Sequence, residues 1–219
     1  MGRLLHLPSL YAILDADAAA AAGWTIPALA GALLDGGARL LQVRAKTAGS
    51  AALLELCRSV VALARPAGAT VVVNDRPDIA MIAGADGVHV GQDDLPVAAV
   101  RSAFPRLAIV GISTHTSAQI EAAVAAQPDY VAVGPVFGTS TKATGYDAVG
   151  LDLVREAARV HSGAAARPVV AIGGITLERA REVLAAGAES VAVISDLFTG
   201  GDPAGRVRHY LEALGPPSA

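Results

Sequence analysis

Residues 84–90 have the sequence GADGVHV, which joins the end of an expected helix to the start of an expected strand. A glycine at the C-terminus of a helix adopts a left-handed conformation without a clash at Cβ. The β-branched apolar residues that follow are typical of a buried strand. The same design recurs in GARLLQV at 37–43 and GAESVAV at 187–193, and in PDYVAV at 128–133 with proline as the helix stop. The repeat therefore indicates that a helix leads into a buried strand several times along the chain.

Apolar runs of this kind predict eight strands, at residues 10–14, 40–43, 70–73, 87–90, 108–112, 130–133, 169–172 and 191–194. Between them, apolar residues recur at helical spacing, as at Leu53, Leu56 and Val60. Regular alternation of strand and helix implies parallel strands covered by helices. Eight such units predict an α/β protein with one domain, a (β/α)8 TIM barrel over residues 1–219 with a frayed tail at 215–219. A doubly wound open sheet is the alternative on pattern alone.

The composition excludes several classes of protein. With 17 Lys and Arg against 20 Asp and Glu, the net charge of −3 gives no basic excess for nucleic acid or an anionic membrane surface. A hydrophobic fraction of 53% excludes a disordered chain. The sequence has no apolar run long enough to span a membrane, and Asp15 and Asp17 argue against a secretory signal at its apolar start. The single cysteine cannot form an internal disulfide, so we expect a cytoplasmic protein.

Polar residues follow nearly every expected strand, at the position where such barrels carry their active sites. These residues are Gln42, Arg44 and Lys46 after the second strand, Asn74 and Asp75 after the third, Asp93 and Asp94 after the fourth, Ser113 and His115 after the fifth, Thr139 to Lys142 after the sixth, Gly173 and Gly174 after the seventh, and Ser195 and Asp196 after the eighth. Because parallel strands all point the same way, we expect these residues to gather at one end of the barrel.

Two of the carboxylates, those of Asp75 and Asp94, stand at neighbouring strand ends. Mg²⁺ takes carboxylate ligands and fills its remaining positions with water and phosphate oxygens, so this pair could hold one ion. By spacing alone Asp93 is as good a candidate as Asp94, and Asp75 could instead cap a helix that begins at Pro77. The spacing leaves both questions open.

The same end of the barrel is expected to carry cationic side chains and backbone N–H groups that are not covered by side chains. A rim of cations and hydroxyl groups is made by Arg44, Lys46, Lys142, Thr139, Ser140 and Thr141. Gly173, Gly174 and Ser195 offer backbone N–H groups where phosphate commonly binds in such barrels, next to a helix expected to start at Thr176. Carboxylates and cations together indicate a metal–diphosphate complex, and the Gly174 and Ser195 side indicates a second phosphate.

Seven motifs occur in order along the chain: QVRAK at 42–46, NDRPDIA at 74–80, GADGVHVGQDD at 84–94, GISTH at 111–115, GPVF and TSTK within 134–142, AIGGI at 171–175 and IS at 194–195. Together they resemble the thiamine-phosphate synthase family, also called thiamine phosphate pyrophosphorylase, over about residues 10–200. The resemblance implies a transferase that joins hydroxymethylpyrimidine diphosphate to hydroxyethylthiazole phosphate. Its products would be thiamine monophosphate and pyrophosphate, with Mg²⁺ as the cofactor.

The resemblance also implies a role for each site residue. The pyrimidine diphosphate would be bound by Gln42, Val43, Arg44, Ala45, Lys46, Asn74, Ser113 and Lys142, the thiazole phosphate by Thr139, Ser140, Thr141, Gly174, Ile194 and Ser195, and Mg²⁺ by Asp75 and Asp94. In the family the diphosphate leaves first, so no nucleophile is needed. Arg44, Lys142 and Ser113 are then the expected catalytic residues. One departure is visible, because Gly138 stands where the family often has proline.

Two other functions fit the same barrel. A thiazole tautomerase-like enzyme would use a histidine in the loop of His115, and a non-catalytic regulator would only bind a vitamin phosphate. The ionic groups at Arg44, Asp75, Asp94 and Lys142 favour the synthase over both. We further expect His89 to be a hydrogen-bonded interior residue and Cys57 to pack in the core. The sequence leaves the oligomeric state open, including a homo-oligomer, and it does not give the order of substrate binding.

Overall fold

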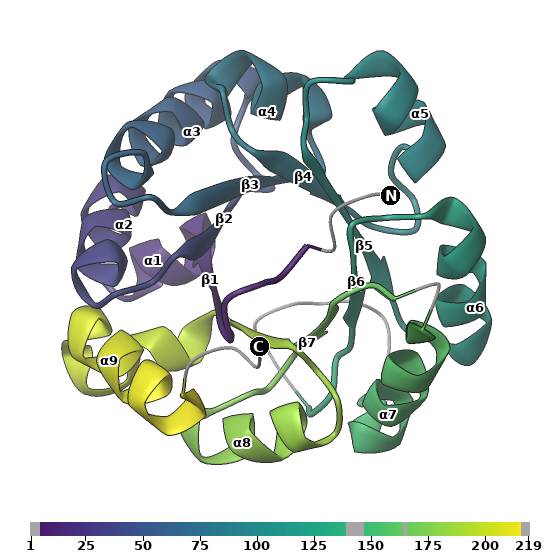
Figure 1. Ribbon diagram of the computed structural model, residues 1–219. Coiled ribbons are helices and arrows are strands. Elements are labelled where there is room, and N and C mark those ends of the chain that lie inside the picture. The colour runs from purple at the N-terminus through teal and green to yellow at the C-terminus, as the bar shows by residue number, and fades with distance from the viewer. Residues whose placement is uncertain (1–4, 139–146, 164–165, 216–219) are drawn as a thin grey trace.

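The computed structural model describes residues 5–138, 147–163 and 166–215. In this part of the chain eight parallel strands close into a barrel in chain order, and β1 pairs with β8 (Figure 1). The strands are β1 (Leu10–Asp15), β2 (Leu40–Arg44), β3 (Thr70–Asn74), β4 (Gly87–Val90), β5 (Ile109–Thr114), β6 (Tyr130–Val133), β7 (Val169–Ile172) and β8 (Ser190–Val193). The predicted (β/α)8 barrel is confirmed, and the open sheet is wrong.

Helices form a ring around the barrel in Figure 1. They are α1 (Ala16–Ala21), α2 (Ile26–Asp35), α3 (Ser50–Ala64), α4 (Pro77–Ala83), α5 (Val97–Ala103), α6 (Ser117–Ala126), α7 (Gly150–Val160), α8 (Leu177–Ala185) and α9 (Pro203–Leu214), with a short 3-10 helix, η2 (Ser195–Gly201), between β8 and α9. None of the helices in the described ranges is long and apolar enough to cross a membrane.

All eight predicted strands are found, and most differences lie at their carboxyl ends. Strands β1, β2, β3 and β5 run one or two residues further than the apolar runs, so they end on Asp15, Arg44, Asn74 and Thr114. Polar residues continue these strands because backbone pairing does not depend on side-chain polarity. Asp15 pairs in register with Arg44, and Asn74 pairs with His89. Several site residues therefore lie on rigid strands rather than on loops.

The glycine that begins each repeat of the GADGVHV kind has the expected left-handed backbone conformation. Gly84, Gly37 and Gly187 all have positive φ angles, of 73°, 104° and 105°. The acidic residue of the repeat also has a structural task, since the Asp86 side chain accepts a hydrogen bond from the backbone N–H of Val71 at 2.7 Å. Asp129 accepts one in the same way at the start of β5. These acids hold the first residues of a strand to the unit that follows it in the chain.

Apolar side chains fill two separate layers. Outward-facing strand residues such as Leu41, Val73 and Val131 pack against the helices. A second cluster, made of Leu7, Tyr11, Ile13, Leu40, Val72, Ile109, Tyr130, Ala132, Val170, Ala192 and Ile194, fills the interior of the barrel. The described ends of the chain lie together at the amino end of the barrel, where Ser9 Oγ is 3.4 Å from the carbonyl oxygen of Gly215 (Figure 1). The carboxyl ends of the strands therefore form the opposite end, the mouth, that can receive a ligand.

Candidate active site

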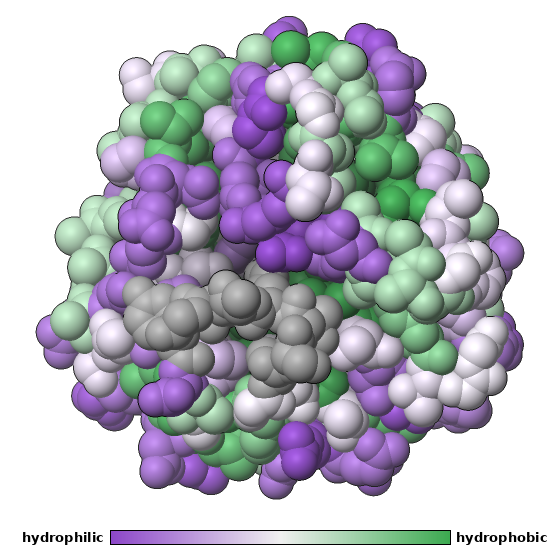
Figure 2. Space-filling view, turned by 180° about the vertical axis from the view of Figure 1, so that it is seen from behind, coloured by the Kyte–Doolittle hydropathy of each residue, from purple (hydrophilic) through white to green (hydrophobic). Residues whose placement is uncertain are grey.

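Polar side chains line the inside of the barrel near its mouth. Gln42 on β2, Asn74 on β3 and His89 on β4 are only 2%, 8% and 5% exposed, and Ser113 on β5 is half-buried. Figure 2 shows the end of the molecule opposite to that in Figure 1, where hydrophilic residues gather near the centre. Buried polar groups of this kind need hydrogen-bond partners. The Oε1 atom of Gln42 has none among the described residues.

Arg44 is held at the mouth by a carboxylate that the sequence did not single out. Its Nη1 atom donates to Oδ2 of Asp15, the last residue of the neighbouring strand. Asp15 also accepts a hydrogen bond at 3.0 Å from the backbone of Ala18, which caps α1. The Arg44 side chain is 12% exposed. A buried carboxylate on the adjacent strand thus fixes the position of the guanidinium group.

Val43 and Ala45 lie between Gln42, Arg44 and Lys46 in the sequence but face the other way. Both side chains belong to the layer between strands and helices. This follows from the alternation of side chains along a strand. Only the backbone of these two residues is therefore available to a ligand at the mouth.

Asp75 and Asp94 come together beside a lysine. Lys46 Nζ is 3.3 Å from Oδ2 of Asp75, and Asp94 Oδ2 accepts a hydrogen bond from the backbone of Gly91 at 2.7 Å. Burial raises the pKa of Asp75, the charge of the adjacent Asp94 raises it further, and the charge of Lys46 acts in the opposite direction. Two adjacent carboxylates raise the free energy of ionising each other, and a cation bound between them reduces this repulsion.

The structure shows where the residues in both open questions lie, while the choice of metal ligand stays a prediction. Asp93 is exposed, and Asp94 is the residue that faces Asp75. Helix α4 has Arg76 at its N-cap and no side-chain capping bond, so the alternative in which Asp75 caps this helix is wrong. Among the described residues no group of three or more His, Cys, Asp or Glu side chains is arranged to hold a metal. A carboxylate pair fits Mg²⁺, which keeps water and phosphate oxygens as its other ligands.

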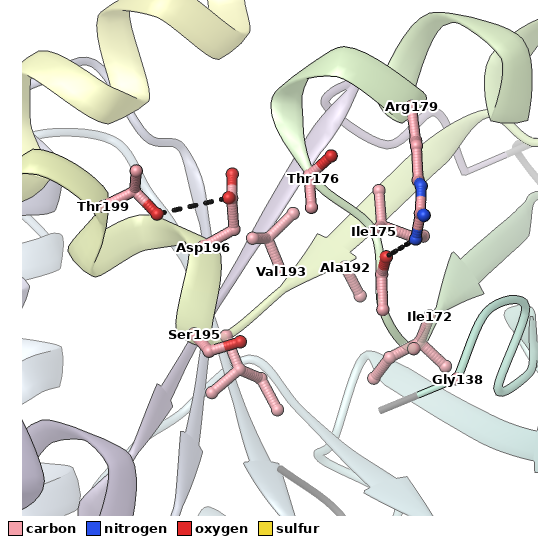
Figure 3. Close-up of a pocket in the computed structure, with 13 residues that line it drawn as sticks. Gly138, Ile172, Ile175, Thr176, Arg179, Ala192, Val193, Ser195, Asp196 and Thr199 are labelled. Carbon is pink, nitrogen blue, oxygen red and sulfur yellow. Dashed lines mark hydrogen bonds between the residues drawn. The ribbon is translucent and has the colours of Figure 1, made fainter. Parts of the chain in front are cut away.

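A pocket of about 400 Å³ opens at the ends of β7 and β8 (Figure 3). Its wall includes Gly173, Gly174, Ile194 and Ser195. The two glycines have φ angles of 101° and 61°, and a Cβ atom on Gly174 would lie 2.6 Å from the carbonyl oxygen of Gly138. The loops after β6 and β7 can therefore pass this close only with glycine. The pocket has the size of a small-molecule site.

Asp196 is one of the residues that line this pocket, and it had no predicted role. Arg206 on α9 donates to both of its carboxylate oxygens at 2.8–3.0 Å, and the Tyr210 hydroxyl donates to it at 2.5 Å. The same carboxylate accepts the first N–H of α8, from Leu177, at 3.2 Å. Asp196 thus joins η2, α8 and α9. No sequence pattern indicates this, because the partners come from separate elements.

Arg179 is a second residue that sequence reasoning missed. It is the one cationic side chain among the described residues that line the pocket. Its Nη1 atom donates to the carbonyl oxygen of Gly174 at 3.2 Å (Figure 3). Its guanidinium group lies 4.6 Å from the centre of the Phe137 ring. Arg179 therefore ties α8 to the loop after β6.

The two histidines near the mouth are both hydrogen-bonded. His89 lies 2.8 Å from Ser113 Oγ and 2.8 Å from the Tyr130 hydroxyl, as expected for an interior residue. His115 Nδ1 lies 2.5 Å from the carbonyl oxygen of Gly134. Cys57 is buried in the core as predicted. The predicted residues Thr139, Ser140, Thr141 and Lys142 lie outside the described residues.

The comparisons with known proteins agree with this geometry. Residues 10–197 match the family described as thiamine monophosphate synthase. The chain belongs to the thiamine monophosphate synthase family. It is 42% identical to the thiamine-phosphate synthase of Koribacter versatilis over 212 aligned residues. The aligned residues make up 96% of this chain and 97% of that relative. The thiamine-phosphate synthase of Methanospirillum hungatei is 41% identical over 83% of this chain and 86% of its own.

The fold of a solved family structure is also similar. Thiamine phosphate pyrophosphorylase from Pyrococcus furiosus superimposes with a TM-score of 0.83 and 30% sequence identity, over 94% of this chain and 95% of that one. Membership of the thiamine monophosphate synthase family makes the chain a transferase of thiamine biosynthesis.

Proposed function

We propose that this enzyme joins hydroxymethylpyrimidine diphosphate to hydroxyethylthiazole phosphate in a Mg²⁺-dependent reaction that yields thiamine monophosphate and pyrophosphate. The observation that carries the proposal is the facing pair of Asp75 and Asp94 beside Lys46, at the same end of the barrel as the Gly174 and Ser195 pocket. Two carboxylates and a cation suit a metal–diphosphate group. Backbone N–H groups near the start of α8 suit a second phosphate.

Each substrate has a distinct set of partners in this proposal. Gln42 Oε1 is a buried acceptor without a donor among the described residues, and the amino group of the pyrimidine can supply that donor. Asn74 and Ser113 orient the same substrate, with the backbone of Val43 and Ala45. Gly174, Ile194 and Ser195 bind the thiazole phosphate, and Thr139, Ser140 and Thr141 complete its surroundings.

In the reaction, a C–O bond between the pyrimidinylmethyl carbon and the diphosphate breaks, and that carbon then forms a bond with the thiazole nitrogen. Mg²⁺, when bound by Asp75 and Asp94, would neutralise charge on the departing diphosphate. Arg44, Lys46 and Lys142 attract the same group, and Ser113 donates a hydrogen bond to it. Groups already oriented toward developing charge typically contribute about 10²–10³-fold each to the rate.

The proposal extends to the organisation of the protein. It includes one domain over residues 1–219, small-molecule substrates only, and a location in the cytoplasm, which agrees with a single cysteine. The proposal leaves the oligomeric state open, including a homo-oligomer.

An assay of pyrophosphate release tests the function. Release should require both substrates, stop on addition of EDTA and return with Mg²⁺. Full release after exhaustive chelation would contradict the metal role, and no release with both substrates present would contradict the reaction.

The tautomerase alternative is tested with His115→Ala. A synthase should keep most of its activity, because the His115 backbone N–H donates to Gln119 on α6 and the His115 ring lies against the backbone carbonyl of Gly134, and the proposed reaction assigns this ring no step. Loss of nearly all activity in this variant would favour the tautomerase.

A further inference from the structure

A chain of hydrogen bonds crosses the interior of the barrel beneath the mouth. Gln42 Nε2 donates to the Tyr11 hydroxyl at 2.9 Å, and the hydroxyls of Tyr11 and Tyr130 are 3.1 Å apart. The Tyr130 hydroxyl is 2.8 Å from His89 Nδ1, and His89 Nε2 is 2.8 Å from Ser113 Oγ. The first four residues are at most 5% exposed, and Ser113 is half-buried. The chain therefore joins two groups that we assign to one substrate, Gln42 and Ser113.

Gly111 provides the space for this chain. It pairs in register with His89 on one side and with Tyr130 on the other. A Cβ atom at Gly111 would lie 2.0 Å from Tyr130 Cζ. Without a side chain there, the His89 and Tyr130 rings stack at 5.5 Å between centroids and 15° between planes. The glycine of the GISTH motif thus allows the contact that leads to the serine of the same motif.

The donors in this hydrogen-bond chain are expected to point one way, from Gln42 toward Ser113. Tyr11 accepts from the Gln42 amide, so its single hydrogen goes to the Tyr130 oxygen. With the Tyr11 hydrogen on that oxygen, Tyr130 is expected to donate its own hydrogen to His89 Nδ1; the ring is then neutral, with its hydrogen on Nε2 directed at Ser113 Oγ. Burial raises the pKa of both phenols, so they remain protonated. The hydroxyl hydrogen of Ser113 is left to point away from His89.

We propose that Tyr11, Tyr130 and His89 are positioning residues that keep the Ser113 hydroxyl hydrogen directed at the bound substrate, so that Ser113 meets the diphosphate as a donor. This inference rests on the proposed function for the identity of the substrate. No proton moves along the chain in the reaction. Hydrogen bonds in series polarise one another, which makes Ser113 a better donor as negative charge develops on the leaving group.

The tautomer of His89 tests the direction of the chain without substrate. Long-range ¹H–¹⁵N correlation spectra of the whole protein, assigned with the His89→Asn variant, should show a neutral ring with its hydrogen on Nε2. A hydrogen on Nδ1, or a doubly protonated ring near neutral pH, would overturn the proposal.

Kinetics test the consequence for Ser113. Tyr130→Phe keeps the ring and removes the link, and it should lower kcat about tenfold, the value of one hydrogen bond to a charged group, with the KM for thiazole phosphate unchanged. In a Ser113→Ala background the same substitution should change kcat by less than about twofold, because it acts only through Ser113. A tenfold loss in both backgrounds would show a general structural role and overturn the proposal.

Thr114→Val is the matched control. Thr114 is the neighbour of Ser113 on β5, and its buried hydroxyl donates to the carbonyl oxygen of Ala132 outside the chain. This variant also loses one buried hydrogen bond, so it should lower the melting temperature as Tyr130→Phe does but leave kcat unchanged. An equal loss of kcat in Thr114→Val would overturn the proposal. The tautomer measurement needs no turnover, so a wrong hydrogen-bond direction and a wrong choice of substrates give different results.

Discussion

The two sides of the barrel mouth differ in how they offer positive charge. On the side of β1 to β4 the groups are charged side chains, with Arg44 against Asp15 and Lys46 against Asp75. On the side of β7 and β8 the pocket is lined by the glycine backbone and by mostly uncharged side chains, and Arg179, its one cationic side chain among the described residues, donates to the carbonyl oxygen of Gly174. The charged side chains near β1 to β4 therefore suit a group that gains negative charge during a reaction. The pocket at β7 and β8 suits a group whose charge stays constant.

This difference separates two kinds of kinetic effect. A diphosphate gains charge on its leaving oxygen as the bond breaks, so side chains beside it should act mainly on kcat. The thiazole phosphate keeps its charge throughout, so the pocket on the β7 and β8 side should act mainly on KM. Each prediction below tests whether the two sides divide in this way.

The largest effect is expected at the metal pair. Asp94→Asn removes one of the two carboxylates proposed to hold Mg²⁺ and should lower kcat about 10²–10³-fold, as measured by pyrophosphate release at saturating substrates. Asp93→Asn is the matched control, since Asp93 is exposed and the change in charge is the same. Equal effects in the two variants would remove the distinction between these residues.

Lys142→Ala should come next. If this lysine meets the departing diphosphate, kcat should fall about 10²-fold while the KM for thiazole phosphate stays the same. Single-turnover measurements separate this loss from slow product release. A change confined to the KM for thiazole phosphate would indicate that Lys142 acts on that substrate and not on the departing diphosphate.

Arg206→Gln should affect the opposite parameter. It removes the cationic partner of Asp196 and leaves the charge of that carboxylate uncompensated, so it should raise the KM for thiazole phosphate about tenfold with little change in kcat. The melting temperature should also fall. Arg208→Gln on the same helix is the control, because Arg208 is exposed and lies 3.7 Å from Asp202. Exposed pairs of this kind contribute little, so neither quantity should change there.

The smallest effect is expected for Ser195→Ala. In the proposed site, backbone N–H groups of the same pocket would share the phosphate, so the KM for thiazole phosphate should rise by only about threefold. Titration of the phosphate and its unphosphorylated alcohol by calorimetry measures this directly. A loss as large as that in Asp94→Asn would mean that a side chain, not the backbone, holds the phosphate.

The strands could be predicted because their signal is local. An apolar run marks each strand, and in three units a glycine with a positive φ precedes it, at Gly37, Gly84 and Gly187; neither signal depends on distant partners. The same holds for the position of Asp75, which follows β3 directly. The choice between Asp93 and Asp94 was not local, since it depends on which carboxylate turns toward Asp75 once β3 and β4 are side by side.

The roles of Asp15 and Asp196 could not be predicted, because each depends on partners from other elements of the fold. Asp15 meets Arg44 only because β1 and β2 pair in one register, and a shift of one residue would separate them. Asp196 meets Arg206 only because α9 packs beside η2. The chemistry of a side chain can be read from its type, but its partners depend on the closed barrel.

The position of the two chain ends has a practical consequence. Residues near both ends lie together at the amino end of the barrel, close enough for Ser9 to reach Gly215, and far from the mouth. A tag or a second enzyme fused at either end would leave substrate access unobstructed. The same closeness allows a circular permutation in which a short linker joins the old ends and the chain is opened in an exposed loop at the amino end instead. Such a permutant would keep all eight strands and alter only the order in which they are synthesised.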